Sequence, residues 1–184
     1  ARAITYASRD KEVFFYEARQ WNSPFQRQSH EFLVDGVRML DDRSYFHYMG
    51  TGITPAMTSP PVGQGSVYCM TARDRDGAYL DGGKTYKIEL PAPIPAANFW
   101  SFMLYSGQTR SILETDQKSG GIDSKKTGLA KNKDGSVTVY FGPEAPAGKE
   151  GDWAQTMPGK SFNLMFRLYG PLEPWFDKTW RPGD

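Results

Sequence analysis

The chain has 184 residues, enough for one domain with a core of its own. Its 22 Lys and Arg residues against 21 Asp and Glu give a net charge of +1, so total charge indicates neither a nucleic-acid ligand nor an anionic membrane surface. One cysteine and two histidines exclude a disulfide framework and a cysteine-based zinc cluster, and we expect no metal and no cofactor.

Residues 1–40 carry the weakest pattern of the chain, and we expect them to form an extended linking segment. After them, Tyr45, Tyr48, Met49 and Ile53 recur at helical spacing, which predicts one N-terminal helix over about residues 42–57. Asp41 or Asp42 is available as its N-cap.

Two alternating segments follow. Residues 67–72 alternate with period two, and Asp74–Gly77 has the composition of a tight turn. Residues 83–90 alternate again, with Tyr86, Ile88 and Leu90 on one side, as in a half-buried antiparallel strand. We therefore expect a hairpin, with the second segment returning beside the first.

The remaining strands surround one fully apolar segment. Residues 99–105 are apolar on both faces, which predicts a central strand, and residues 106–135 are predicted to be long loops with one short strand near 111–114. Residues 136–142 and 162–169 alternate as strands. The tail has three prolines after residue 170, so we expect it to wrap the body and cover a sheet edge.

These elements predict one domain over residues 41–184. Nineteen glycines, thirteen prolines and 14% aromatic residues favour short strands joined by turns over a helical bundle. The expected fold is mainly β, an antiparallel β-sandwich of jelly-roll type that carries the N-terminal helix. No stretch has the apolar length of a membrane span.

One candidate site follows the central strand. Tyr105, Arg110, Glu114 and Asp116 could face a common cleft, where they would supply the acid, base and oxyanion groups of a hydrolase. The chain has no GxSxG elbow for a nucleophilic serine. These four residues are the catalytic candidates.

A second set of candidates would bind a ligand. Trp153, Trp175 and Trp180 lie in loop or tail sequence, where exposed indoles would stack on sugar rings or apolar ligands; alternatively, they fill the ends of the sandwich. Arg167 lies out of register with the apolar face of its strand and could bind a carboxylate or phosphate, although an internal ion pair or plain exposure is equally open.

Several unusual blocks carry a family resemblance. The blocks NFWSFMLYSGQTRSILETDQ, GLAKNKDGSVTVYFGPEAPAGKEGDWAQTMPGKSF and RLYGPLEPWFDKTWRPGD occur in that order, after YLDGGKTYKIELPAPIPAANFW. From about Arg43 to Asp184 the chain closely resembles the bacterial domain of unknown function 1214 (DUF1214). The resemblance implies a jelly-roll-like sandwich and export to the periplasm or beyond, with no established activity or catalytic motif.

The resemblance also implies a partner. In such proteins the domain forms the C-terminal half and a domain of unknown function 1254 (DUF1254) precedes it, so we expect this chain to be a fragment or processed product of a larger protein. Our first hypothesis is a secreted domain that binds a small molecule or saccharide or supports that partner domain. The alternatives are a hydrolase whose site is shared with the missing domain, and a structural or assembly domain.

Overall fold

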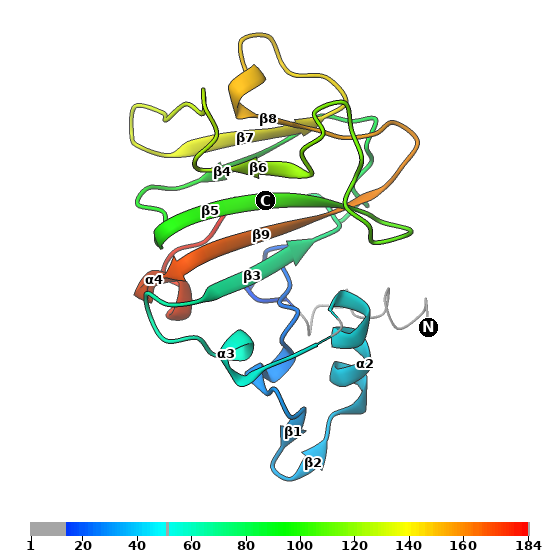
Figure 1. The fold of residues 1–184 in the computed structure, drawn as a ribbon, viewed down its shortest axis with the longest axis vertical. Helices are drawn as coiled ribbons and strands as arrows, with labels where there is room; N and C mark the ends of the chain where they lie inside the picture. The colour runs from blue at the N-terminus through cyan, green and yellow to red at the C-terminus, as the bar shows by residue number, and fades with distance from the viewer. Residues whose placement is uncertain (1–13, 51, 184) are drawn as a thin grey trace.

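The computed structural model describes residues 14–50 and 52–183, and Figure 1 shows their arrangement. Residues 1–13 of the predicted linking segment therefore lie outside the described part of the chain. The elements, in chain order, are β1 (Leu33–Val34), β2 (Val37–Arg38), α2 (Leu40–Met49), α3 (Pro55–Thr58), β3 (Ser66–Thr71), β4 (Tyr86–Leu90), β5 (Ala96–Ser106), β6 (Gly121–Asp123), β7 (Val137–Gly142), β8 (Trp153–Gln155), β9 (Phe162–Pro171) and α4 (Glu173–Phe176), with 3-10 turns at Gln26–Gln28 and Glu150–Asp152.

Two main sheets form the body of the described chain. One has the strand order β3-β9-β5-β6 and is antiparallel throughout; the other has the order β4-β7-β8, in which β4 and β7 are antiparallel and β7 and β8 parallel. Strands β1 and β2 form a small separate sheet. The prediction of a mainly β fold with antiparallel pairing is confirmed, and β5 is central as expected, whereas the jelly-roll type stays a prediction.

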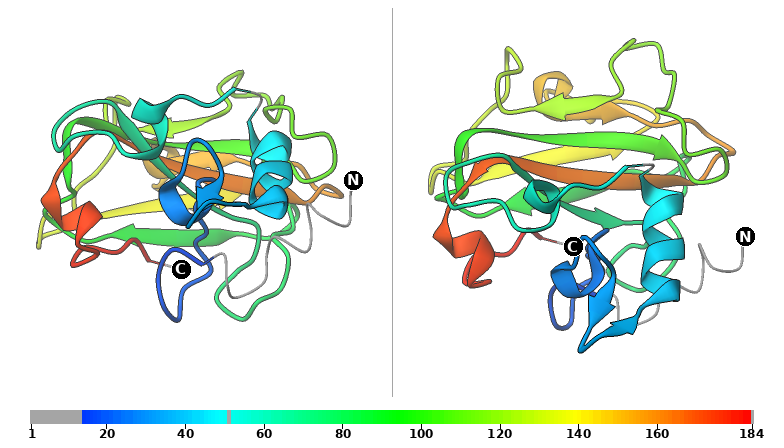
Figure 2. Two further views of the ribbon diagram at one scale, coloured as in Figure 1. Left: turned by 90° about the horizontal axis from the view of Figure 1, so that it is seen from below. Right: turned by 60° about the horizontal axis from the view of Figure 1, so that its bottom comes forward.

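The inner faces of the two sheets share one core, as the layers in Figure 2 show. Phe102 of β5 contacts Phe166 of β9 in its own sheet and Phe141 of β7 in the other, with ring centroids 4.7 and 5.3 Å away. Cys69 of β3 is fully buried in this core. Because alternate residues of each strand point inward, period-two patterning alone selects these core residues.

The prediction of one helix over residues 42–57 is wrong. The segment forms two helices instead, α2 and the single turn α3. Gly50 ends α2 in an extended conformation (φ −155°, ψ 156°), and Pro55 starts α3 at a position where its missing N–H costs nothing. The N-cap of α2 is Met39, and Asp41 and Asp42 lie in its first turn, where carboxylates favour the helix dipole.

The expected hairpin between residues 67–72 and 83–90 is also wrong. The Asp74–Gly77 turn does form, with Asp74 Oδ1 accepting the N–H groups of Asp76 and Ala78, but it is closed by a bridge between Arg73 and Tyr79. The chain then crosses to the other layer, where β4 pairs with β7 while β3 pairs with β9. Strands β3 and β4 are therefore outer strands of opposite sheets.

Both ends of the described chain close the side of the molecule between β3 and β4. Trp21 is 1% exposed, and its indole N–H donates to the carbonyl of Gly183 over 2.8 Å. The N–H of Gly183 donates in turn to Glu89 of β4. The prediction that the tail covers a sheet edge is confirmed. The domain boundary near residue 41 stays a prediction, and Trp21, from the predicted linker, is part of the core.

None of the helices in the described residues is long and apolar enough to cross a membrane.

Candidate functional site

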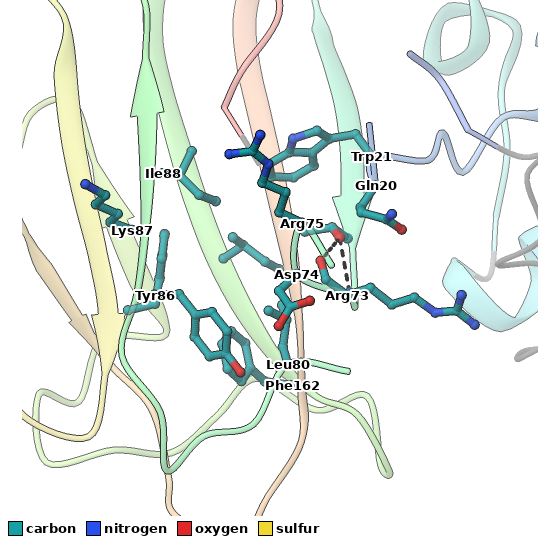
Figure 3. A pocket seen from close by; sticks show the side chains of 13 residues that line it. Gln20, Trp21, Arg73, Asp74, Arg75, Leu80, Tyr86, Lys87, Ile88 and Phe162 are labelled. Atoms are coloured by element: carbon teal, nitrogen blue, oxygen red, sulfur yellow. Dashed lines mark hydrogen bonds between the residues drawn. The ribbon is translucent and has the colours of Figure 1, made fainter. Parts of the chain in front are cut away.

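A cavity of about 160 Å³ opens between β3 and β4, where the expected hairpin is absent (Figure 3). Its walls come from both layers and from the segment that crosses between them. The apolar wall residues are Trp21, Leu80, Ile88, Phe141, Phe162 and Leu164.

Inward-facing positions of the strands explain the apolar walls. Ile88 alternates with Lys87, so Lys87 is exposed and its side chain points away from the cavity in Figure 3. Leu80 is held where it is because its N–H donates to Ala72 at the end of β3. The cavity exists because β3 and β4 diverge into two sheets and no side chain of the described residues fills the space between their ends.

The mouth of the cavity is charged. Asp74 is occupied by the amides of its own turn, at 3.1 and 2.9 Å. The guanidinium of Arg73 lies over Tyr79, 5.0 Å from the ring centroid, outside the cavity. Arg75 runs toward Trp21 at the mouth, and it has no ion pair with any residue of the described ranges. Arg75 is thus the cation best placed to meet an acidic group on a ligand.

The four catalytic candidates do not all line one groove. Arg110 and Glu114 line a different, open groove of about 790 Å³. Glu114 also lines a second groove together with Asp116, and Asp116 accepts a hydrogen bond from Gln155 Nε2 over 3.1 Å. The hydroxyl of Tyr105 accepts a hydrogen bond from Arg167 Nη2 over 2.7 Å. The arrangement does not place an acid, a base and an oxyanion donor around one point.

The tryptophan candidates lie mostly inside the molecule. Trp175 and Trp180 are 3% and 6% exposed, and Trp180 stacks on Phe166 with its indole N–H donating to the carbonyl of Pro91. Trp153 is half-buried and donates to the carbonyl of Gly142 over 2.9 Å. Trp175 and Trp180 therefore fit the alternative in which the indoles fill the sandwich, because neither presents a ring face to solvent.

Arg167 is brought together with Tyr105, although the sequence placed them in different candidate sets. Both are half-buried on the face of the four-stranded sheet that points away from the core. The cavity could not be predicted from the sequence, because Arg75 lies in a predicted turn and Ile88 alternates as in an ordinary half-buried strand. Within the described ranges no group of three His, Cys, Asp or Glu residues could hold a metal ion.

Comparisons with known proteins give a family and a fold. None of the curated proteins matches the chain. The VPA0106 protein from Vibrio parahaemolyticus is similar in structure, with a TM-score of 0.58 and 19% identity over 99% of this chain and 40% of that one. An uncharacterized protein from Burkholderia cenocepacia gives a TM-score of 0.40 and 17% identity over 88% of this chain and 46% of that one.

This chain therefore spans less than half the length of either solved protein. The likeness to the Vibrio protein concerns the fold alone. The family model for "Protein of unknown function (DUF1214)" matches residues 65–173, which is more than half of the chain. The chain belongs to the DUF1214 family.

Proposed function

We propose that this chain is a binding module for a small apolar molecule, which it holds in the cavity between β3 and β4. The observation that carries the proposal is an apolar cavity of about 160 Å³ that opens to the surface. An apolar protein cavity of about 150 Å³ is large enough to bind benzene. The ligand therefore has a ring or a short branched alkyl group of that size.

The chemistry of the walls selects among the ligand classes. A saccharide would bury hydroxyl groups against Ile88, Phe141 and Leu164, which offer no side-chain hydrogen-bond partner. An apolar ring gives up no hydrogen bonds to water when it enters the cavity, and the burial of its apolar surface favours binding. Arg75 at the mouth adds a preference for a ligand whose exposed end carries a carboxylate.

Titration with ring-sized probes tests the proposal. Toluene, phenol and benzoate are titrated by ligand-observed NMR and by thermal shift against the wild-type chain. Leu80→Phe fills the cavity from its wall, whereas Leu40→Phe is the matched control on α2, at a residue that is 63% exposed. We expect saturable binding to the wild type and to Leu40→Phe, and none to Leu80→Phe.

Two results would contradict the proposal. The first is that none of the three probes binds the wild-type chain. The second is that Leu80→Phe binds them as well as Leu40→Phe does, because the probes would then sit elsewhere. If Arg75 binds a carboxylate at the mouth, Arg75→Gln will bind benzoate more weakly than the wild type does and will bind toluene equally well.

The location and the partner of the domain are further parts of the proposal. We place the domain outside the cytoplasm, next to an N-terminal DUF1254 domain, on the basis of the family resemblance. The chain's span of 40% of the Vibrio protein is compatible with such a partner. Fractionation of bacteria that express the full-length protein tests the location, and recovery in the cytoplasm contradicts it.

A further inference from the structure

The outer face of the four-stranded sheet is unusually apolar. The outer face is defined here as the side of β9, β5 and β6 that points away from the core. Strand β3 is left out of this definition, because Phe25 and its neighbours pack on Tyr68 of β3. Solvated sheet faces normally alternate to polar residues, whereas aromatic residues, Met and Arg are enriched at protein interfaces. Besides the buried Ser101 and Asn163, the outer face carries Phe99, Met103 and Tyr105 on β5, Met165, Arg167 and Tyr169 on β9, and Asp123 on β6.

Arg167 is held in one position on this face. Its Nη2 donates to Tyr105 over 2.7 Å, its Nε lies 3.2 Å from Met165 Sδ, and its Cζ is 5.7 Å from the centroid of the Tyr68 ring. The side chain is half-buried, yet it forms no ion pair with a carboxylate in the described part of the chain. A fixed, partly desolvated guanidinium of this kind is a ready partner for a carboxylate.

Asp123 is the acidic counterpart on the same face. Ser101 of β5 pairs with Asp123 on one side and with Arg167 on the other, so the two charges lie two strands apart, about 10 Å at the usual strand spacing. Asp123 Oδ1 accepts the N–H of Lys125, and its other oxygen has no hydrogen bond to a described residue. Lys126 lies nearby, but its ammonium donates to the carbonyl of Trp153 over 2.8 Å.

We propose that the outer face is the interface of a symmetric dimer of this chain, with the two-fold axis running along β5. Such an axis exchanges the β9 side of one copy with the β6 side of the other. In this arrangement each apolar residue of β5 contacts the same residue of the second copy. Arg167 of each copy lies opposite Asp123 of the other, so the interface contains two such ion pairs.

The same axis satisfies a further pair. The ammonium of Lys125 lies 4.4 Å from the centroid of the Phe99 ring, and Phe99 stacks on Tyr169 at 4.0 Å. In the dimer, Lys125 meets the Phe99–Tyr169 stack of the second copy, a cation–π contact. An axis across the strands at the level of Ser101 would instead place Arg167 over Arg167 and Asp123 over Asp123, which is repulsive. The charges therefore select the axis along β5.

Charge reversal tests the dimer. Sedimentation equilibrium over micromolar concentrations is expected to show a dimer for the wild-type chain. Arg167→Asp and Asp123→Arg each put two like-charged pairs into the interface and weaken association roughly 100-fold or more, as measured for close interfacial charge pairs. The double variant, Arg167→Asp with Asp123→Arg, restores opposite charges and recovers the dimer. Lys133→Asp, an exposed reversal in the turn before β7, is the matched control and dimerises as the wild type does.

A graded series at Asp123 covers the case in which Arg167→Asp fails to fold, which a thermal melt of each variant reveals. Asp123→Asn removes an attraction, whereas Asp123→Arg adds a repulsion, so the second must weaken the dimer more than the first. A monomeric wild-type chain overturns the proposal. So does a dimer that both reversals leave intact, or one in which Asp123→Asn and Asp123→Arg are equivalent.

Discussion

Removal of the Trp21 side chain measures how far the N-terminal segment belongs to the fold. Trp21 is 1% exposed and lies between rings of the four-stranded sheet, 6.4 Å from Phe102 and 6.3 Å from Phe166 between centroids. Its indole N–H also ties the segment to the C-terminal tail at Gly183. Trp21→Ala is therefore expected to lower the free energy of unfolding by about 4 kcal/mol, the usual cost of deleting a buried aromatic residue.

A more conservative substitution at Trp21 separates the contribution of ring burial from that of the hydrogen bond to Gly183. Trp21→Phe keeps most of the buried ring and removes the hydrogen bond to Gly183, so about 1–2 kcal/mol is expected to be lost. For a chain of this length, about 4 kcal/mol corresponds to a fall in melting temperature of roughly 10 °C. Leu33→Ala is the control, since Leu33 is 39% exposed on β1, and its cost is expected within about 0.5 kcal/mol.

Equilibrium urea unfolding followed by far-UV circular dichroism measures these differences without relying on the substituted tryptophan. A loss below about 1 kcal/mol for Trp21→Ala would show that the Trp21 side chain contributes little to the stability of the core. Residues 14–22 would then be the linking segment that the sequence predicts rather than part of the core.

Three further predictions use the same unfolding assay. The hydroxyl of Tyr16 is buried without a hydrogen-bond partner among the described residues, so Tyr16→Phe is expected to keep or raise stability at pH 7, by up to about 1 kcal/mol. Burial raises the pKa of Tyr16 above its ordinary value of about 10, so the folded chain keeps a proton that the unfolded chain releases; wild-type stability falls above pH 10, and the Phe variant falls less. Gly82→Ala would place a Cβ 2.1 Å from the carbonyl oxygen of Met157 and cost more than about 2 kcal/mol, whereas Gly52→Ala, with nothing within 4 Å, is neutral; equal effects would contradict the packing. Asp152→Ala leaves the N–H of Ala130 without its acceptor at 2.6 Å and costs about 2–3 kcal/mol; a neutral result would contradict that role of Asp152.

Strands with a clear period of two were predictable from the sequence. β3, β4, β7 and β9 fall where alternation places them, because half-buried strands need one apolar face, and β5 falls on the segment that is apolar on both faces. β8 was not predicted as a strand, since Trp153 lies in predicted loop or tail sequence. Its three residues pair in parallel with β7 across a loop, and so short a segment has too few alternations to show a pattern.

The predictions of one helix over residues 42–57 and of a hairpin were wrong for a different reason. Helical spacing continues past Gly50, and the break there is a backbone conformation that the apolar pattern does not record. The Asp74–Gly77 turn forms as predicted, yet a turn fixes only its own residues. Which sheet β4 joins depends on its long-range partner β7, and local sequence does not specify that partner.

The candidate site could not be predicted from the sequence either, because it too depends on long-range strand pairing. The cavity is a space left by the divergence of β3 and β4, so it depends on tertiary topology and not on a motif. Arg167 was predicted as an anion-binding candidate from its place in the strand, and the structure adds its hydrogen bond to Tyr105. The position of Trp175 and Trp180 in tail sequence left open whether they stack on a ligand or fill the sandwich, and the tail folds both indoles into the core.

The most direct test of ligand binding is a crystal of the wild-type chain soaked with iodobenzene, in which anomalous scattering locates the iodine. We expect an iodobenzene ring between Ile88 and Phe141, inside the cavity that opens between β3 and β4. The same crystals of Leu80→Phe are expected to show no iodine there. Iodine bound only at other places on the wild-type chain, with the cavity between β3 and β4 unoccupied after the soak, would contradict the proposed function.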